Sequence, residues 1–115
     1  MNFKAACELI ADQTLPERET PDTFLGRLRQ GRPPIPGQVT SLILALKVVR
    51  DSLKGADALD RTLAQSLFLI AYESRSLYGV GRANRVDWPP MLDEDLGRIA
   101  IAAYQVFATD LNDDA

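Results

Sequence analysis

The residue types that most often carry out chemistry at neutral pH are nearly missing from this sequence. Its 115 residues include no histidine and one cysteine, Cys7. Histidine is the commonest general acid or base and the commonest metal ligand, and it activates many serine and cysteine nucleophiles. A structural zinc site needs several cysteine or histidine ligands from one chain. We therefore expect a protein that is not an enzyme and that holds neither a metal nor a cofactor.

Two smaller features fit the same expectation. The glycines of the GVGR segment at residues 79–82 do not form a phosphate-binding loop, because such loops follow a strand and match G-x-x-x-x-G-K-[ST] or G-x-G-x-x-G. Cys7 shares one helical face with Phe3 and Ile10. That position favours a small core residue over a reactive thiol.

Three consecutive carboxylates, Asp93, Glu94 and Asp95, form the densest acidic cluster. They could bind a hard cation such as magnesium, although one short acidic run without further ligands is a poor metal site. They also lie at the predicted start of a helix, where acidic side chains interact favourably with the helix dipole. We favour this second interpretation.

Clustered arginines are the candidate anion site. A phosphate or carboxylate could be bound by Arg27, Arg29, Arg82 and Arg85, with Arg32 and Arg75 as further candidates. Binding to nucleic acid is not expected, because the net charge is −3 and duplex-binding proteins present a larger basic face. The same charge disfavours a helix-turn-helix regulator.

Charge is unevenly distributed along the chain. Residues 26–54 contain six basic side chains and one acidic one, whereas residues 87–115 contain seven acidic side chains and one basic one. Such asymmetry can steer a partner or pair subunits. We favour the simpler alternative, in which the charges neutralise one another within the fold.

Two proline-containing segments are the candidate partner-binding surfaces. The first consists of Arg32, Pro33, Pro34 and Ile35, and the second of Trp88, Pro89 and Pro90. Prolines hold an extended backbone at low entropic cost, and apolar or tryptophan side chains beside them are common in protein recognition. In the alternative interpretation, which we favour, Ile35 and Trp88 fold back and close the ends of a helical bundle.

Apolar residues recur at helical spacing along the chain, and no segment shows the alternation expected of a strand. The pattern predicts an all-α fold, a compact bundle of about five helices of which the first two are short and the last three long. The first predicted helix begins near Phe3 and ends before Pro16, and the second begins after a Thr20 cap, with Pro21 in first position, and ends at Gly31. The third runs from about 36 to 54, with Pro36 in its first turn and Gly55 after its end. The fourth runs from about 57 to 84 with Asp57 as cap, and the fifth runs from about 90 to 111.

The predicted helices imply one domain over residues 1–111, followed by a flexible acidic tail at residues 112–115. The first residues lack the apolar core of a signal peptide. The longest apolar run, residues 42–46, is far shorter than a membrane span. A lone cysteine fits a reducing compartment, so we expect a cytoplasmic protein. A core of this size is modest, and a homodimer would supplement it.

The segments GRPPIPGQVTSLILALKVV and SRSLYGVGRANRVDWPPMLDEDLGRIA resemble a family of small uncharacterised cyanobacterial proteins of about this length. The resemblance extends from Met1 to about Phe107. Some members carry the label dethiobiotin synthetase, an ATP-dependent ligase with a phosphate loop and a parallel sheet. Neither feature is present here, so we consider that label a misannotation for this chain. The resemblance implies a cyanobacterial setting and supplies no catalytic residues.

Taken together, these features predict a non-enzymatic helical module for protein–protein interaction, such as an assembly factor, adaptor or small regulatory subunit. The proline-containing segments would contact the partner protein. The alternative is a small-ligand or enzyme-accessory domain that binds an anion through the arginines.

Overall fold

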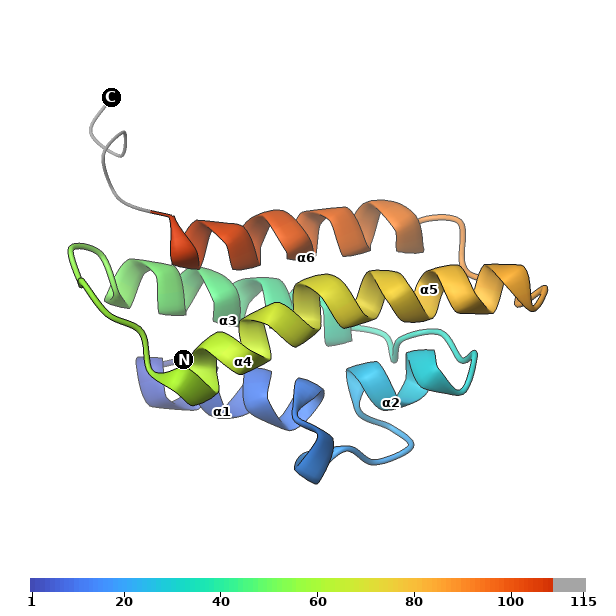
Figure 1. The fold of residues 1–115 in the computed structure, drawn as a ribbon, viewed down its shortest axis with the longest axis horizontal. Coiled ribbons are helices and arrows are strands. Elements are labelled where there is room, and N and C mark those ends of the chain that lie inside the picture. The colour runs from blue at the N-terminus through green and yellow to red at the C-terminus, as the bar shows by residue number, and fades with distance from the viewer. Residues whose placement is uncertain (109–115) are drawn as a thin grey trace.

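The computed structural model describes residues 1–108, and these form helices joined by short connections (Figure 1). The elements are α1 (Phe3–Thr14), the 3₁₀ turn η1 (Pro16–Arg18), α2 (Phe24–Arg29), α3 (Gln38–Ser52), α4 (Arg61–Phe68), the π-helical turn η2 (Leu69–Glu73), α5 (Ser74–Ala83) and α6 (Leu92–Phe107). Because α4, η2 and α5 are continuous, residues 61–83 make one long helix. Within residues 1–108 the predicted all-α bundle of five helices, the first two short, is therefore confirmed.

The first two helices are short because proline and turn residues interrupt them. Asn2 caps α1, its Oδ1 accepting a 2.8 Å hydrogen bond from the backbone N–H of Ala5. Leu15 is extended, as expected for a residue before proline, and ends the helix. The prediction that Thr20 caps the second helix is wrong. Thr20 instead opens a turn, and the hydroxyl of Thr23 caps α2 three residues later.

Helix α3 also begins later than the sequence suggested. We predicted Pro36 in its first turn, but Pro36 lies before the helix, in a turn closed by the N–H of Gln38 on the carbonyl of Ile35. Gly37 follows with φ of 88°, a left-handed conformation that favours glycine, and the helix starts only after it. At the other end α3 stops at Ser52, three residues before the left-handed Gly55.

The long helix starts at Arg61, not near residue 57. Asp60 is its cap and accepts a 3.1 Å hydrogen bond from the N–H of Leu63, so the predicted cap, Asp57, is wrong. In the middle of the helix, η2 contains one wide π turn, and there the Ser74 hydroxyl donates a 2.6 Å hydrogen bond to the carbonyl of Ile70. Such turns kink a helix, and they are frequent at functional sites.

Helix α6 ends at Phe107, because Ala108 is extended. Its apolar residues Leu92, Leu96, Ile99, Ala103 and Val106 are buried, whereas Phe107 is half exposed. On α3 the apolar residue Leu44 is likewise exposed, whereas Leu42, Ile43 and Leu46 are buried. The predicted continuation of α6 to residue 111 and the predicted tail at residues 112–115 extend outside the described residues.

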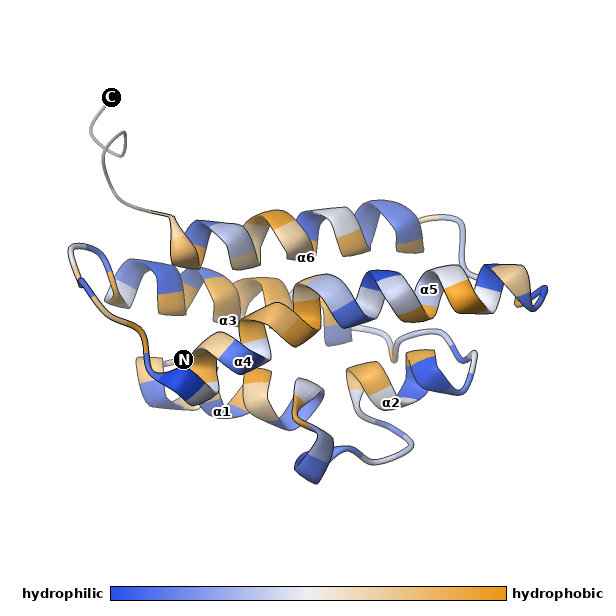
Figure 2. Cartoon of the chain, viewed as in Figure 1, coloured by the Kyte–Doolittle hydropathy of each residue, from blue (hydrophilic) through white to orange (hydrophobic). Residues whose placement is uncertain are grey.

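One apolar core joins the helices. Helix α3 packs between α1 and α6, while the long helix packs on α1 and α2 and, through η2, on α6. Figure 2 shows hydrophobic segments where these helices face one another. The fully buried side chains that fill the centre include Ile10, Phe24, Leu42, Leu46, Leu67, Ile70, Leu96 and Ile99. Within residues 1–108 no helix combines the length and apolar character needed to cross a membrane.

Candidate functional site

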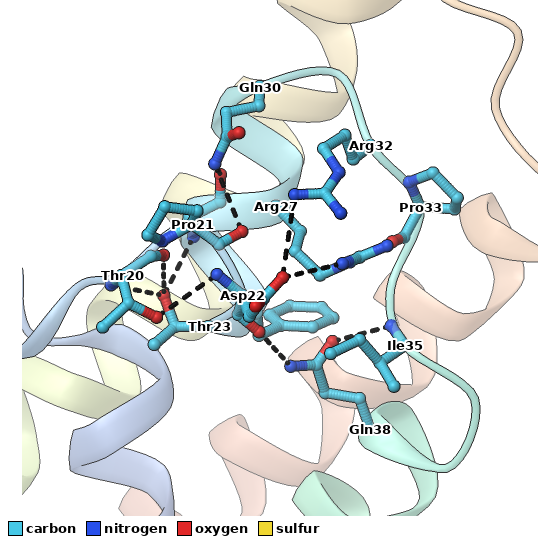
Figure 3. A network of polar contacts seen from close by, with 12 residues as sticks. Thr20, Pro21, Asp22, Thr23, Arg27, Gln30, Arg32, Pro33, Ile35 and Gln38 are labelled. Atoms are coloured by element: carbon cyan, nitrogen blue, oxygen red, sulfur yellow. Dashed lines mark hydrogen bonds and ion pairs between the residues drawn. The ribbon is translucent and has the colours of Figure 1, made fainter.

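The first proline-containing segment is tied to α2 by a partly buried arginine, Arg27 (Figure 3). Arg27 donates a 2.6 Å hydrogen bond from Nε to the carbonyl oxygen of Pro33, and its Nη1 lies 3.1 Å from Oδ1 of Asp22. Its side chain is only 14% exposed. Arg32 approaches the same Asp22 oxygen at 3.6 Å. The guanidinium of Arg27 therefore fixes the position of the loop backbone, and both arginines are partly neutralised by one carboxylate.

A pair of glutamines holds the other side of this loop. The N–H of Ile35 donates a 3.0 Å hydrogen bond to Oε1 of Gln38, the first residue of α3 (Figure 3). Nε2 of Gln38 donates to Oε1 of Gln13 at 2.9 Å and to the carbonyl of Asp22 at 3.1 Å. Gln13 also accepts from the N–H of Phe24. One polar network thus joins the end of α1, the start of α2, the loop and the start of α3.

The loop presents one large apolar side chain to solvent. Ile35 is 39% exposed, so the expectation that it folds back into the bundle is wrong. Ile35 and Pro36 lie between two surface depressions. One has a volume of about 270 Å³ and is also lined by Pro89 and Leu92. The other, of about 340 Å³, is also lined by Leu9 and Gln13.

The second proline-containing segment differs, because its tryptophan is packed inside. Trp88 is 9% exposed, its Nε1 donates a 3.0 Å hydrogen bond to the carbonyl of Tyr78, and its ring stacks on that of Tyr78 at 6.0 Å between centroids. Trp88 is therefore packed inside the bundle, as the alternative interpretation expected, and its candidate role in partner binding stays a prediction. Pro89 is half-buried at the depression it shares with Pro36, whereas Pro90 is exposed.

The arginines do not form one convergent anion site. Arg29 is bound to Glu19 through two hydrogen bonds of 3.0 and 3.1 Å, and these bonds raise the pKa of the Arg29 guanidinium. Arg82 and Arg85 are exposed near the end of α5, and within residues 1–108 neither makes an ion pair. Arg75 pairs with Asp93 at 2.8 Å. Most of the candidate arginines thus already pair with carboxylates of the same chain.

The carboxylates at the start of α6 lie in its first turn, as predicted. Asp93 pairs with Arg75, and Asp95 lies 3.2 Å from Arg98, while Glu94 is exposed. In the described part of the chain no three potential ligands among aspartate, glutamate and cysteine are placed to hold a metal ion. The first turn of α6 gives these carboxylates a favourable interaction with the helix dipole.

Cys7 lies at the edge of the core, not in its centre. It packs against the buried residues but remains partly exposed in a cavity of about 270 Å³ between α1 and α4. Burial raises the pKa of its thiol, and the negative charges of Asp60 and Glu8 raise it further. The thiol is therefore protonated at neutral pH. Ser66 lines the same cavity, and its buried Oγ has no hydrogen-bond partner among the described residues.

An exposed apolar surface on the long helix and α6 was not predicted. Its members are Phe68, Tyr72, Ile101 and Tyr104, each more than half exposed. The signal was available, since Phe68 and Tyr72 lie four residues apart on the side of the helix away from Leu63, Leu67 and Ile70.

Neither a family model nor a curated protein nor a solved structure matches this chain. The resemblance to cyanobacterial proteins therefore stays a prediction.

Proposed function

We propose that this protein is a non-enzymatic protein–protein interaction module, of the kind that serves as an adaptor, an assembly factor or a small regulatory subunit. The segment Pro33–Gly37 is the surface that binds the partner. The observation that carries this proposal is the exposed Ile35 on a backbone held from both sides, by Arg27 at Pro33 and by Gln38 at its own N–H.

The fixed backbone matters for affinity. A loop that is already ordered loses little conformational entropy on binding, so more of the contact free energy appears as affinity. Ile35 offers an apolar contact of the size that anchors many interfaces, and the depressions on both sides can accept side chains of the partner. The partner expected from this chemistry is a protein segment with an aliphatic or aromatic side chain that fits beside Pro36 and Leu92.

The depression beside Leu92 also has a polar rim. Asp95 and Arg98 line it and pair with each other at 3.2 Å, and Arg98 is the more exposed of the two, at 62%. An acidic group on the partner segment could therefore bind Arg98 while its apolar side chain contacts Ile35. Such a rim contact contributes more to orientation and association rate than to affinity.

Site-specific photo-crosslinking tests this proposal. A photoreactive phenylalanine analogue is placed at Ile35 in one variant and at Leu44, an exposed apolar residue of α3, in a matched control. In cells of the source organism we expect a discrete crosslinked protein from position 35 and none from position 44. Ile35→Asp should abolish capture of that protein while the helical circular dichroism remains, because the introduced charge must be desolvated on binding.

The opposite results would overturn the proposal. Equal crosslinking from both positions would show non-specific contact. Full capture of the same protein by Ile35→Asp would show that the partner binds elsewhere.

A further inference from the structure

Four exposed apolar residues form a second surface, separate from the Ile35 loop. We define the Phe68 face as Phe68, Tyr72, Ile101 and Tyr104, which are 57%, 61%, 61% and 67% exposed. Phe68 and Tyr72 stack on each other with ring centroids 5.2 Å apart and planes 18° from parallel. Their rings contact each other and solvent, and the side chains on the opposite side of the same helix pack into the core.

The two helices that carry this face run antiparallel and side by side (Figure 1). Arg75 fixes their register, because its Nη1 contacts both Oδ1 of Asp93 at 2.8 Å and the Asp93 carbonyl at 3.1 Å. Moving away from this pair at about 1.5 Å per residue along each helix brings Phe68 to the level of Ile101. The aromatic pair and the exposed residues of α6 therefore form one continuous surface.

Two small residues of α6 lie near this surface. Gly97 and Ala100 are both half-buried, and a Cβ added at Gly97 would meet no atom within 4 Å. From the helix rise, the four residues span about 12 Å along the helices, and the axes of packed helices lie about 8–10 Å apart. Contiguous exposed apolar patches on a small protein commonly mark an interaction site.

The charges at the ends of the Phe68 face indicate its occupant. Arg61 lies at one end and Glu94 at the other; both are exposed, and neither forms an ion pair with another described residue. Beside Arg61, the Asp60 carboxylate accepts the cap hydrogen bond from Leu63, and beside Glu94, Arg75 and Asp93 neutralise each other. The unpaired side chains of Arg61 and Glu94 thus place a positive charge at one end of the apolar surface and a negative charge at the other.

This pattern is complementary to itself. A two-fold axis that runs across the helices, in the plane of the contact, reverses the direction of the second copy and brings its Glu94 end to the Arg61 end of the first. It also places the two apolar centres on each other. An isologous interface requires this kind of self-complementarity, because the same patch of each subunit forms both sides of the contact. We propose that the Phe68 face is the interface of an antiparallel homodimer.

Sedimentation equilibrium tests the proposal on the full chain. The chain mass is 12.7 kDa, and we expect a species of twice that mass for the native protein. Tyr104→Glu should shift the equilibrium to the monomer. The matched control Leu44→Glu, at an exposed apolar site on α3, should remain dimeric. Both substitutions are at exposed positions, and circular dichroism verifies that each variant keeps its helical content.

Charge exchange tests the antiparallel arrangement. Arg61→Glu and Glu94→Arg should each weaken the dimer about tenfold, because each places like charges together across the interface. The double variant should restore the native dissociation constant.

Three results would overturn the proposal. These are a native protein that stays monomeric at high micromolar concentration, a dimer that Tyr104→Glu leaves intact, and a double exchange that fails to restore association. A native monomer that instead sediments with phospholipid vesicles would assign the face to a lipid surface. None of the four residues of the Phe68 face lines the depressions beside Ile35, so the crosslinking result at position 35 is read independently of the dimer.

Discussion

The Nε of Arg27 donates a 2.6 Å hydrogen bond to the carbonyl oxygen of Pro33, and this contact fixes the loop that carries Ile35. Arg27→Lys should therefore lower the free energy of unfolding by about 1–2 kcal/mol, because an ammonium group cannot reproduce the planar geometry that reaches both Pro33 and Asp22. Urea denaturation measures the change. Hydrogen exchange should also become faster at the Ile35 N–H.

Arg29→Lys is the matched control on the same helix. Arg29 is 45% exposed in its pair with Glu19, so its replacement should cost less than about 1 kcal/mol. Equal losses at Arg27 and Arg29 would contradict a special role for the Pro33 contact.

The core prediction compares two leucines of α3. Leu46 is fully buried, whereas Leu44 is 52% exposed two residues earlier. Leu46→Ala should destabilise the protein by about 2–5 kcal/mol through lost burial and the cavity left behind. Leu44→Ala should change stability by about 0.5 kcal/mol or less. Urea melts in which the two variants lose similar stability would contradict the orientation of α3.

A second pair compares two glycines of α5. An added Cβ at Gly81 would lie 2.7 Å from Nε1 of Trp88, whereas one at Gly79 would meet nothing within 4 Å. Gly81→Ala should therefore cost about 1–3 kcal/mol, since the indole must move despite the better helix propensity of alanine. Gly79→Ala should instead stabilise by about 0.5–1 kcal/mol. Thermal denaturation of both variants checks the opposite signs, and a stabilising Gly81→Ala would contradict the Trp88 packing.

Two buried serines of the long helix should respond differently to alanine. The hydroxyl of Ser74 donates a 2.6 Å hydrogen bond to the Ile70 carbonyl at the π turn, whereas the buried Oγ of Ser66 has no partner among the described residues. Ser74→Ala should cost about 1 kcal/mol. Ser66→Ala should be neutral or stabilising, because it removes a buried polar group without breaking a bond. Chemical denaturation separates these outcomes, and a clear loss of stability at Ser66 alone would contradict them.

The thiol of Cys7 gives a pH prediction. Burial is the largest cause of its raised pKa, and the negative charges of Asp60 and Glu8 are the smaller ones. Since the folded state holds the thiol proton more tightly than the unfolded chain, the contribution of Cys7 to stability is complete below the ordinary thiol pKa. It is lost as the pH rises through the higher pKa of the folded state. Thiolate absorbance measured against pH gives that value directly.

Asp60→Asn should move the Cys7 pKa down toward its ordinary value. Asparagine keeps the helix cap that Asp60 provides, so the change removes the charge with little effect on α4. Asp57→Asn is the control, because Asp57 does not contribute to the shift. Equal thiol pKa values in the Asp60 variant and the native protein would contradict the electrostatic cause.

Helical spacing was enough to predict the bundle and much of its core, because a buried stripe such as Leu63, Leu67 and Ile70 leaves a clear period in the sequence. The helix starts were harder to predict. Asp57 and Asp60, like Thr20 and Thr23, are equally good caps by residue type, and only the packed backbone selects the later one. Local preference cannot decide between caps three residues apart.

The candidate site shows the same limit. The sequence identified the proline-containing segments, and Pro36 and Pro89 do line one depression. It could not show that Trp88 turns inward, because that depends on Gly81, seven residues away on another element, leaving room for the ring. The hydrogen bond from Arg27 to Pro33 could not be predicted either, because any residue type can supply a backbone carbonyl as acceptor.

Trp88 also provides an optical probe, since it is the sole tryptophan of the sequence. All indole emission from this protein therefore reports on one packed ring, which stacks on Tyr78 and connects directly to Pro89. Release of the ring into water would shift the emission to longer wavelength. Unlabelled protein can thus show, in a stopped-flow experiment, whether occupation of the depression beside Pro89 loosens or tightens the connection between the long helix and α6.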